Sequence, residues 1–288
     1  MKISEIYSKA TRPVFSFEIF PPKTTEGDNK LLNTIADLKK LSPSFISVTY
    51  GAGGSTKDKT IDICENIQSQ FQITTMCHFT CVGASSQEVK NTLQIIESKK
   101  IENVIALRGD PPKEQGVFIK HPNGLANGTE LIQFIKKEQF SFCLAGGCYP
   151  EKHPDSPTLD DDILFLKKKV DAGAEFLITQ LFFSNQLFQN FQKKANSLGI
   201  NVPIVPGIMP ITSFSQIERF KSMANCEIPD DLVNELSLLK DKPADFLTKS
   251  ISFTIAQCKE LLNMGVPAIH FYTLNQSRAT IEIMKSLI

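Results

Sequence analysis

The sequence predicts an α/β protein with a (β/α)8 barrel fold, a TIM barrel, formed as a single domain over residues 1–288. Three observations lead to this fold: apolar, β-rich runs alternate with helical segments, the unit repeats about every 30 residues, and eight such runs fit into the chain. The length would also allow two ordinary domains, but no linker-like stretch divides the chain. The expected strands are 14–20, 44–50, 73–81, 103–108, 141–148, 175–183, 202–208 and 267–272.

The segments between these runs carry helix signals. Ser86-Gln87-Glu88 and Asp160-Asp161-Asp162 stand where helices should begin, and Gly173 and Gly199 stand where helices should end. The alternative fold, a doubly wound open sheet, usually has a Gly-rich turn after its first strand. Here the first strand ends in Pro21-Pro22, which favours the barrel. The expected helices are 28–41, 57–69, 86–100, 128–139, 159–173, 185–198, 213–224, 229–239 and 243–264.

Composition excludes several classes of protein. The chain has 31 basic and 31 acidic side chains, so net charge gives no attraction to nucleic acid or to an anionic membrane. The apolar runs are too short to span a bilayer, and residues 1–13 are too polar for a signal peptide. The seven cysteines form no C-x-x-C pair, and none is spaced from a histidine as in a metal-binding motif. We therefore expect a cytoplasmic protein without disulfides or a metal site.

Polar residues mark the ends of the predicted strands. In (β/α)8 barrels the C-terminal strand ends build the active site, so this ring of side chains predicts a pocket with convergent polar groups. Period-2 alternation turns Glu18 inward with Ser16, while Phe15, Phe17 and Ile19 face the helices. The strand-end residues are Glu18, Thr49, His78, Asp110, Tyr149, Gln180 and Tyr272.

Glu18 is the strongest candidate for chemistry because it lies in an otherwise apolar strand. Removing a carboxylate from water costs several kcal/mol unless a partner or a proton compensates. The alternative is a structural acid paired with Arg or Lys across the barrel. The other candidates also have structural interpretations. His78 could be a histidine of the core, and Asp110 could form a turn in Gly-Asp-Pro-Pro. Gln180 could hydrogen-bond a backbone group. The segment YGAGGST (50–56) is weak evidence for a phosphate cradle.

Eight strings, in order from residue 15 to residue 275, resemble the catalytic domain of the methylenetetrahydrofolate reductase family. The resemblance covers nearly the whole chain and implies a (β/α)8 flavoprotein that binds FAD without a Rossmann fingerprint. It also implies that this chain lacks the regulatory domain that some members carry. The strings are FSFEIFPPK, SVTYGAGGST, CHFTCVG, NVIALRGDPP, CYPEKHP, KVDAGAEFLITQLFF, VPIVPGIMPI and HFYTLN.

The resemblance implies a reaction and roles for individual residues. FAD would take a hydride from NADH or NADPH and then reduce 5,10-methylenetetrahydrofolate to 5-methyltetrahydrofolate by ping-pong kinetics, in one-carbon metabolism and methionine biosynthesis. Glu18 would be the general acid, with Phe17, Phe20 and the Pro-Pro corner expected to raise its pKa. Asp110 would be the second catalytic carboxylate. The substrate-binding candidates are Gln180, Phe214, Gln276 and Arg278.

The same resemblance implies a set of FAD-binding residues and three departures. Asn127 stands where a Tyr is common, Phe165 where an Asn is common, and Gln276 where an Arg is usual, with Arg278 two residues further on. These departures put cofactor affinity and folate binding in question. The implied FAD-binding residues are Thr49, His78, Leu107, Arg108, Gly109, Asp110, Gly147, Tyr149, His153, Asp162 and Lys169.

Two alternatives to this function remain open on the sequence. One is another FAD-dependent barrel oxidoreductase, such as a proline-dehydrogenase-like enzyme, and the other is a degenerate paralogue that binds but does not catalyse. The sequence does not decide between NADH and NADPH; analogy with short bacterial chains favours NADH. Phe188 and Phe191, which look exposed on a helix, hint at a homo-oligomer.

Overall fold

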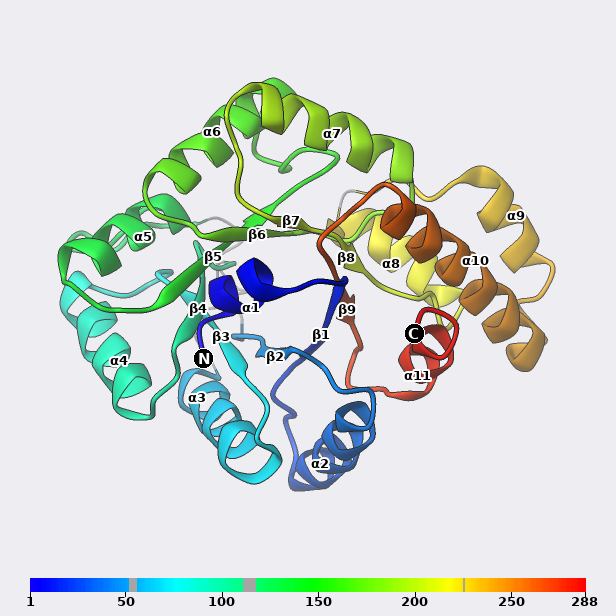
Figure 1. Cartoon of the computed structure of the whole chain (residues 1–288), viewed down its shortest axis with the longest axis horizontal. Coiled ribbons are helices and arrows are strands. Elements are labelled where there is room, and N and C mark those ends of the chain that lie inside the picture. The colour runs from blue at the N-terminus through cyan, green and yellow to red at the C-terminus, as the bar shows by residue number, and fades with distance from the viewer. Residues whose placement is uncertain (52–55, 111–117, 225) are drawn as a thin grey trace.

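Parallel strands form the wall of a barrel in the computed structural model, which describes residues 1–51, 56–110, 118–224 and 226–288 (Figure 1). Neighbouring strands follow the order β7-β6-β5-β4-β3-β2-β1-β9-β8, and these strands pair in parallel. The predicted barrel is therefore confirmed. The strands are β1 Val14–Ile19, β2 Phe45–Val48, β3 Thr75–Thr80, β4 Asn103–Leu107, β5 Cys143–Cys148, β6 Phe176–Thr179, β7 Ile204–Val205, β8 Gly207–Ile208 and β9 Ala268–Tyr272.

The single strand predicted at 202–208 is split into β7 and β8 by Pro206. Proline has no backbone N–H to donate to the ladder, so a strand is interrupted where it occurs. The first part, β7, pairs with β6, and the second part, β8, pairs with β9. The carbonyl of Pro206 still accepts a hydrogen bond from the backbone N–H of His270 at 2.9 Å. The split segment therefore joins the two ends of the sheet and closes the barrel.

Helices surround the strands, as Figure 1 shows. Polar side chains cap several of them, including Ser85, which forms a capping box with Glu88. The helices are α1 Ile3–Lys9, α2 Thr25–Lys39, α3 Lys57–Asn66, α4 Ser86–Ser98, α5 Gly128–Lys137, α6 Leu159–Asp171, α7 Asn185–Ser197, α8 Ser215–Ala224, α9 Asp230–Ser237, α10 Pro243–Asn263 and α11 Arg278–Met284, with a π-helical turn, η2 Ile67–Phe71, after α3.

The apolar core has one layer outside the barrel wall and one inside it. The outer layer packs helices on strands and contains Phe188 and Phe191, both fully buried. The expectation that these two rings mark an interface is therefore wrong: they are the inner face of α7. The inner layer fills the barrel and includes Phe45, Met76 and Phe176. No described helix is both long enough and apolar enough to cross a membrane.

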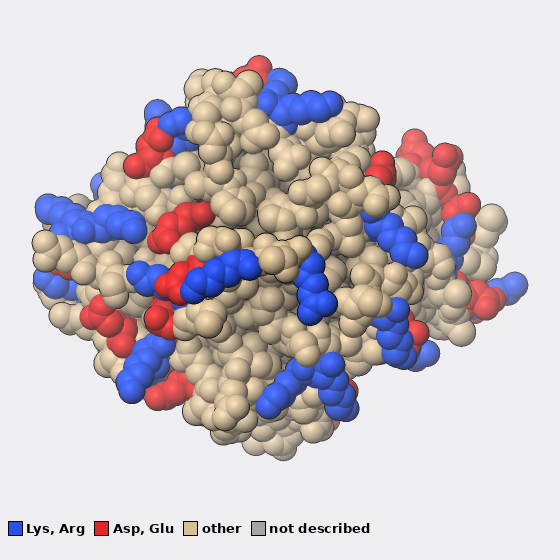
Figure 2. All heavy atoms as spheres, viewed as in Figure 1, with Lys and Arg blue, Asp and Glu red and all other residues tan. Residues whose placement is uncertain are grey.

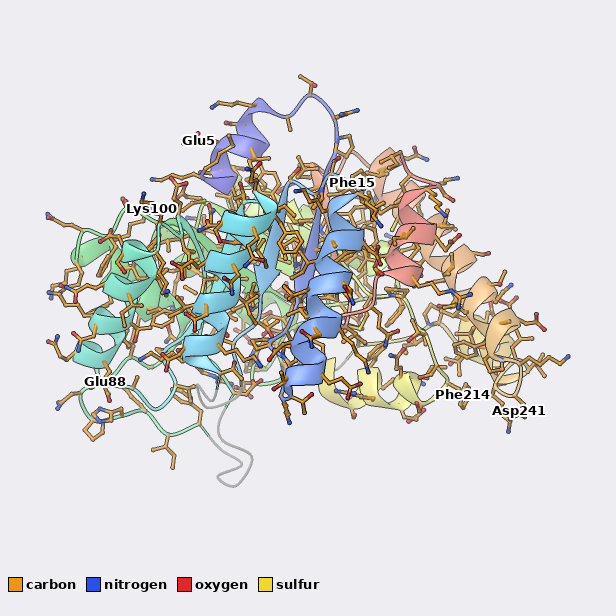
Figure 3. All side chains as sticks on the ribbon, turned by 90° about the horizontal axis from the view of Figure 1, so that it is seen from below. Glu5, Phe15, Glu88, Lys100, Phe214 and Asp241 are labelled. Carbon is orange, nitrogen blue, oxygen red and sulfur yellow. The ribbon has the colours of Figure 1, made fainter. Side chains whose placement is uncertain are left out.

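Helix α1 closes one end of the barrel, opposite the end that carries Phe214 (Figure 3). Its Ile3 is buried against the inner layer. On the face that carries α1, basic and acidic side chains are interspersed (Figure 2). The opposite end, at the carboxyl ends of the strands, is therefore the one left open for a site.

Asn103 fastens α1 to the barrel and should be important for stability. Its buried side chain accepts a hydrogen bond from Ile3 N at 2.7 Å and donates to Met1 O at 3.1 Å and Thr75 O at 3.0 Å. We expect Asn103→Ala to lower the free energy of unfolding by about 2–4 kcal/mol in urea denaturation, because buried backbone groups lose their partners. The matched change Asn91→Ala, on the exposed face of α4, should stay within about 0.5 kcal/mol. Equal losses would contradict this role.

Candidate active site

Glu18 lies near the carboxyl end of β1 and points into the barrel, as strand alternation predicted. The strand register sets it beside Ser47 of β2 and Tyr272 of β9. Ser47 Oγ donates to Glu18 Oε2 across 3.5 Å, and Nε2 of His270 lies 3.7 Å from the same oxygen. Nε2 of His78, on β3, approaches it to 3.2 Å but has no well-directed hydrogen bond within the described residues. Within the described residues, the ionic partners of Glu18 are thus histidines rather than Arg or Lys.

His270 lies behind Glu18 and is fully buried. Its Nδ1 is 2.7 Å from Ser16 Oγ, and its Nε2 is 3.3 Å from Ser47 Oγ. The ring stacks on Phe45, with centroids 5.8 Å apart and planes inclined by 16°. Both ring nitrogens therefore face hydroxyl groups while the ring itself rests on the apolar inner layer.

The electrostatic environment of Glu18 differs from the apolar one that the sequence suggested. Burial raises the pKa of Glu18, but hydrogen bonding to His270 and the nearby His78 outweigh it and lower the pKa to about 2. Burial lowers the pKa of His270, an effect that Glu18 only partly offsets. Phe17 belongs to the outer layer, and Phe20 is 40% exposed. The expectation that these rings raise the Glu18 pKa is therefore wrong for this arrangement.

Glu18 opens into a cleft of about 520 Å³ at the open end of the barrel, which we call the mouth cleft. Asp110 and Gln180, which the sequence analysis placed beside Glu18, line the same cleft. Its lining residues are Glu18, Tyr50, Gly51, Thr80, Leu107, Arg108, Gly109, Asp110, Tyr149, His153, Pro154, Asp155, Gln180, Leu181, Met209, Gln216, Arg219, Phe220, Tyr272 and Leu274.

A second hollow of about 300 Å³, the side cavity, borders the mouth cleft. Five residues line both: Leu107, Arg108, Tyr149, His153 and Asp155. The side cavity is also lined by Ala106, Asn127, Gly128, Thr129, Gly147, Cys148, Ser156, Asp162, Phe165, Leu166 and Lys169. The two hollows therefore adjoin each other through these shared residues.

Two cationic side chains line these hollows. Lys169 is partly buried, its Nζ donates to Gly147 O at 2.6 Å, and burial lowers its pKa. Arg108 pairs with Asp155 at 2.7 Å between the mouth cleft and the side cavity. Asp162 accepts hydrogen bonds from the backbone N–H of His153 and from Ser156 Oγ, so the wall of the side cavity is held by its own polar contacts.

Gly109 turns the chain between Arg108 and Asp110. Its φ of +88° is in the left-handed region, and a Cβ there would lie 2.7 Å from Val82 Cγ1 and 2.8 Å from Thr80 Cβ. A side chain would therefore be both strained and crowded. The glycine lets two charged residues of one loop line the mouth cleft.

Some predicted site residues do not line either hollow. Thr49 instead accepts a hydrogen bond from Thr60 Oγ1 through its carbonyl, and His78 lies behind Glu18. Gln276 lines a separate small cavity, while Arg278 begins α11 and is exposed. Phe214 packs against the cluster around α8, and the α8 ring that lines the mouth cleft is Phe220.

Sequence reasoning missed part of the site, although two patterns could have indicated it. Residues 268, 270 and 272 alternate inward on the last strand, which places His270 on the same face as Tyr272. Gln216, Arg219 and Phe220 have the i, i+3, i+4 spacing of one helix face and together line the mouth cleft.

The positions that depart from the family pattern have definite places. Asn127 caps α5, accepting from Glu130 N at 3.0 Å, and also lines the side cavity. Phe165 lines the side cavity with its ring 58% exposed. In the segment 50–56, residues 52–55 lie outside the described residues, so its suggested phosphate cradle is not placed.

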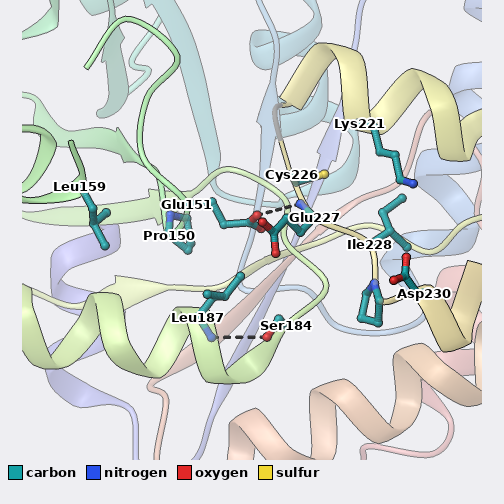
Figure 4. A pocket seen from close by; sticks show the side chains of 11 residues that line it. Pro150, Glu151, Leu159, Ser184, Leu187, Lys221, Cys226, Glu227, Ile228 and Asp230 are labelled. Atoms are coloured by element: carbon teal, nitrogen blue, oxygen red, sulfur yellow. Dashed lines mark hydrogen bonds between the residues drawn. The ribbon is translucent and has the colours of Figure 1, made fainter. Parts of the chain in front are cut away.

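A larger cavity of about 920 Å³ shares no lining residue with the mouth cleft (Figure 4). It lies between the loop after β5 and the segment before α9. Glu151 projects into this region and accepts from Glu227 N at 2.7 Å. Burial raises the pKa of Glu151 to about 7. None of the predicted site residues lines this cavity, so its size does not make it the functional centre.

The fold and the site define a (β/α)8 barrel with a carboxylate–histidine cluster at its mouth and a cationic side cavity. The family model of methylenetetrahydrofolate reductase matches residues 2–288. The chain belongs to the methylenetetrahydrofolate reductase family.

Individual relatives agree with this membership. Methylenetetrahydrofolate reductase (NADH) 1 of Arabidopsis thaliana is 38% identical over 285 residues, covering 95% of this chain and 48% of that protein. The chain thus spans about half the length of this plant relative. The 5,10-methylenetetrahydrofolate reductase of Escherichia coli (strain K12) is 35% identical over 272 residues, covering 94% of this chain and 90% of that protein.

A solved structure shares the fold. It is an uncharacterized protein from Clostridium thermocellum that binds two copies of 5-methyl-5,6,7,8-tetrahydrofolic acid. The TM-score is 0.65 at 17% sequence identity, and the match covers 99% of this chain and 96% of that one. At this identity the likeness supports the barrel fold alone.

Proposed function

We propose that this protein reduces 5,10-methylenetetrahydrofolate to 5-methyltetrahydrofolate with bound FAD and a nicotinamide dinucleotide as hydride source. The observation that carries the proposal is the family match over residues 2–288 combined with Glu18 and Asp110 lining one cleft. The plant relatives named as NADH enzymes favour NADH over NADPH. We propose that the enzyme is cytoplasmic.

The mouth cleft and the side cavity together suit FAD in the chemistry of their lining. Arg108 and Lys169 are donors suited to a pyrophosphate, and Leu107, Tyr149 and Leu166 supply apolar walls. A flavin bound there would allow a hydride to pass from the nicotinamide to the folate. Asp155 would have to release Arg108, or share it, when a phosphate group arrives.

Glu18 would hold the proton that the folate needs. The methylene bridge opens to a cation only if the leaving nitrogen is protonated, and Glu18 is the carboxyl group buried deepest in the mouth cleft. Without substrate, the histidines keep Glu18 ionised at neutral pH. A folate ring that excludes water from the cleft would disfavour this charge and favour uptake of a proton.

Asp110 and Gln180 would bind and orient the substrate. A carboxylate at Asp110 favours a cationic folate over a neutral one. The amide of Gln180 accepts from Leu181 N at 2.9 Å through its Oε1, which fixes the side chain and directs its NH₂ group as a donor. Gln180 therefore suits recognition of an acceptor on the pterin ring.

The absorption spectrum of the purified protein, followed by a methyltetrahydrofolate oxidation assay with an artificial acceptor, tests the proposal. We expect a flavin spectrum and oxidation of methyltetrahydrofolate. A flavin spectrum without this activity would favour another barrel oxidoreductase. A protein that stays colourless after addition of FAD would favour a degenerate binding paralogue.

A further inference from the structure

We propose that His270, acting through Ser47, is a positioning residue that sets the protonation state of Glu18 and so the pH range in which the folate is reduced. This inference deepens the proposed function and rests on it for its catalytic consequence. The underlying contact between a buried imidazole and a partly buried carboxylate can be tested without any substrate.

The contacts of His270 form a short polar chain across three neighbouring strands. Ser16 on β1 faces Nδ1, Ser47 on β2 faces Nε2, and Ser47 also donates to Glu18 Oε2. The strand register enforces this geometry. Ser16 on β1 lies directly opposite His270 on β9, and Glu18 on β1 lies opposite Ser47 on β2 and Tyr272 on β9. Ser47 therefore bridges an imidazole and a carboxylate that are 3.7 Å apart.

A purely space-filling role does not account for these contacts. Ser16, Ser47 and His270 are all fully buried, and a buried hydroxyl or imidazole is costly unless it is hydrogen-bonded. An apolar interior layer lies directly below, where Phe45 stacks on the ring. A leucine would fill such a place, whereas an imidazole adds a donor or acceptor at each ring nitrogen.

The charged and titratable groups around His270 can be named. Glu18 from β1 and His78 from β3 act on it electrostatically, and Tyr272 from its own strand lies edge-on with ring centroids 5.5 Å apart. Glu18 is the acidic member of this group and His78 the basic one. Glu18 and His270 each act on the pKa of the other, so removing one of the two should move the pKa of the remaining one.

The direction of the effect follows from these contacts. His270 lowers the pKa of Glu18, so its loss should raise that pKa. A general acid works in its protonated form, and its activity falls as pH rises through its pKa. Without His270, the fall in folate reduction should therefore occur at a higher pH.

The first test compares pH profiles of the two half-reactions in His270→Gln and Ser16→Ala. We expect the high-pH fall of folate reduction to move upward by about 1 pH unit or more in His270→Gln and by less in Ser16→Ala. Flavin reduction by NADH should keep its profile in both. His121→Gln, a histidine outside the mouth cleft and the side cavity, should leave both profiles unchanged. A uniform loss of rate with no shift in pH would overturn the inference.

The second test uses NMR titration of the protein labelled with ¹³C-histidine, which has four histidines to assign. Because Glu18 raises the pKa of His270, Glu18→Gln should move the His270 titration to lower pH by about 1 unit or more. An unchanged His270 signal would overturn the inference even if His270→Gln failed to fold. If wild type shows the coupling but reduces no folate, the proposed function fails while the pairing of His270 with Glu18 stands.

Discussion

Replacing Glu18 with Gln is expected to lower folate reduction by about 10²–10⁴-fold, the usual contribution of a positioned general acid. Glutamine keeps the size of the side chain and its contact with Ser47, but it cannot deliver the proton that opens the methylene bridge. Flavin reduction by NADH needs no such proton, so its rate should stay within a few-fold of wild type. Stopped-flow measurement of each half-reaction separates the two effects.

The control for this substitution is Glu97→Gln, on the exposed face of α4. It makes the same chemical change far from the mouth cleft and should alter neither half-reaction. An equal loss of both half-reactions in Glu18→Gln would mean that the variant disturbs cofactor binding. In that case Glu18 would not be the general acid.

The barrel could be predicted from the sequence because its signals are local. Each strand alternates or is continuously apolar, several helices carry a capping side chain at their start, and the unit repeats along the chain. The split at Pro206 was readable in principle, since proline cannot donate to a ladder. Phe188 and Phe191 were misread because one helix sequence does not reveal which apolar face meets the barrel wall.

The candidate site was predictable in position but not in electrostatics. Strand ends converge in every such barrel, so Glu18, Asp110 and Gln180 were expected together and line one cleft. The pKa of Glu18 depends on His78 and His270, which arrive from β3 and β9 and are 60 and 252 residues away in sequence. No local pattern around Glu18 encodes those partners, so the apolar neighbours along its own strand suggested the opposite shift.

The interior layer below the site connects catalysis to stability. Phe45 stacks on His270 from one side and meets Phe176 on the other, with centroids 6.4 Å apart. Phe176 in turn packs against Tyr7 of α1 at 5.2 Å. A continuous series of ring contacts, two edge-on and one stacked, thus runs from the α1 end of the barrel to the histidine behind Glu18. Loosening it should affect both the fold and the geometry of the site.

Phe176→Ala should accordingly lower the free energy of unfolding by about 3–5 kcal/mol, because it removes a fully buried ring and leaves a cavity inside a closed barrel. Urea denaturation measures this loss. The matched control Phe165→Ala removes a ring that is 58% exposed and should cost under about 1 kcal/mol. Similar losses at the two positions would show that the interior layer, including the rings beneath His270, does not support the barrel.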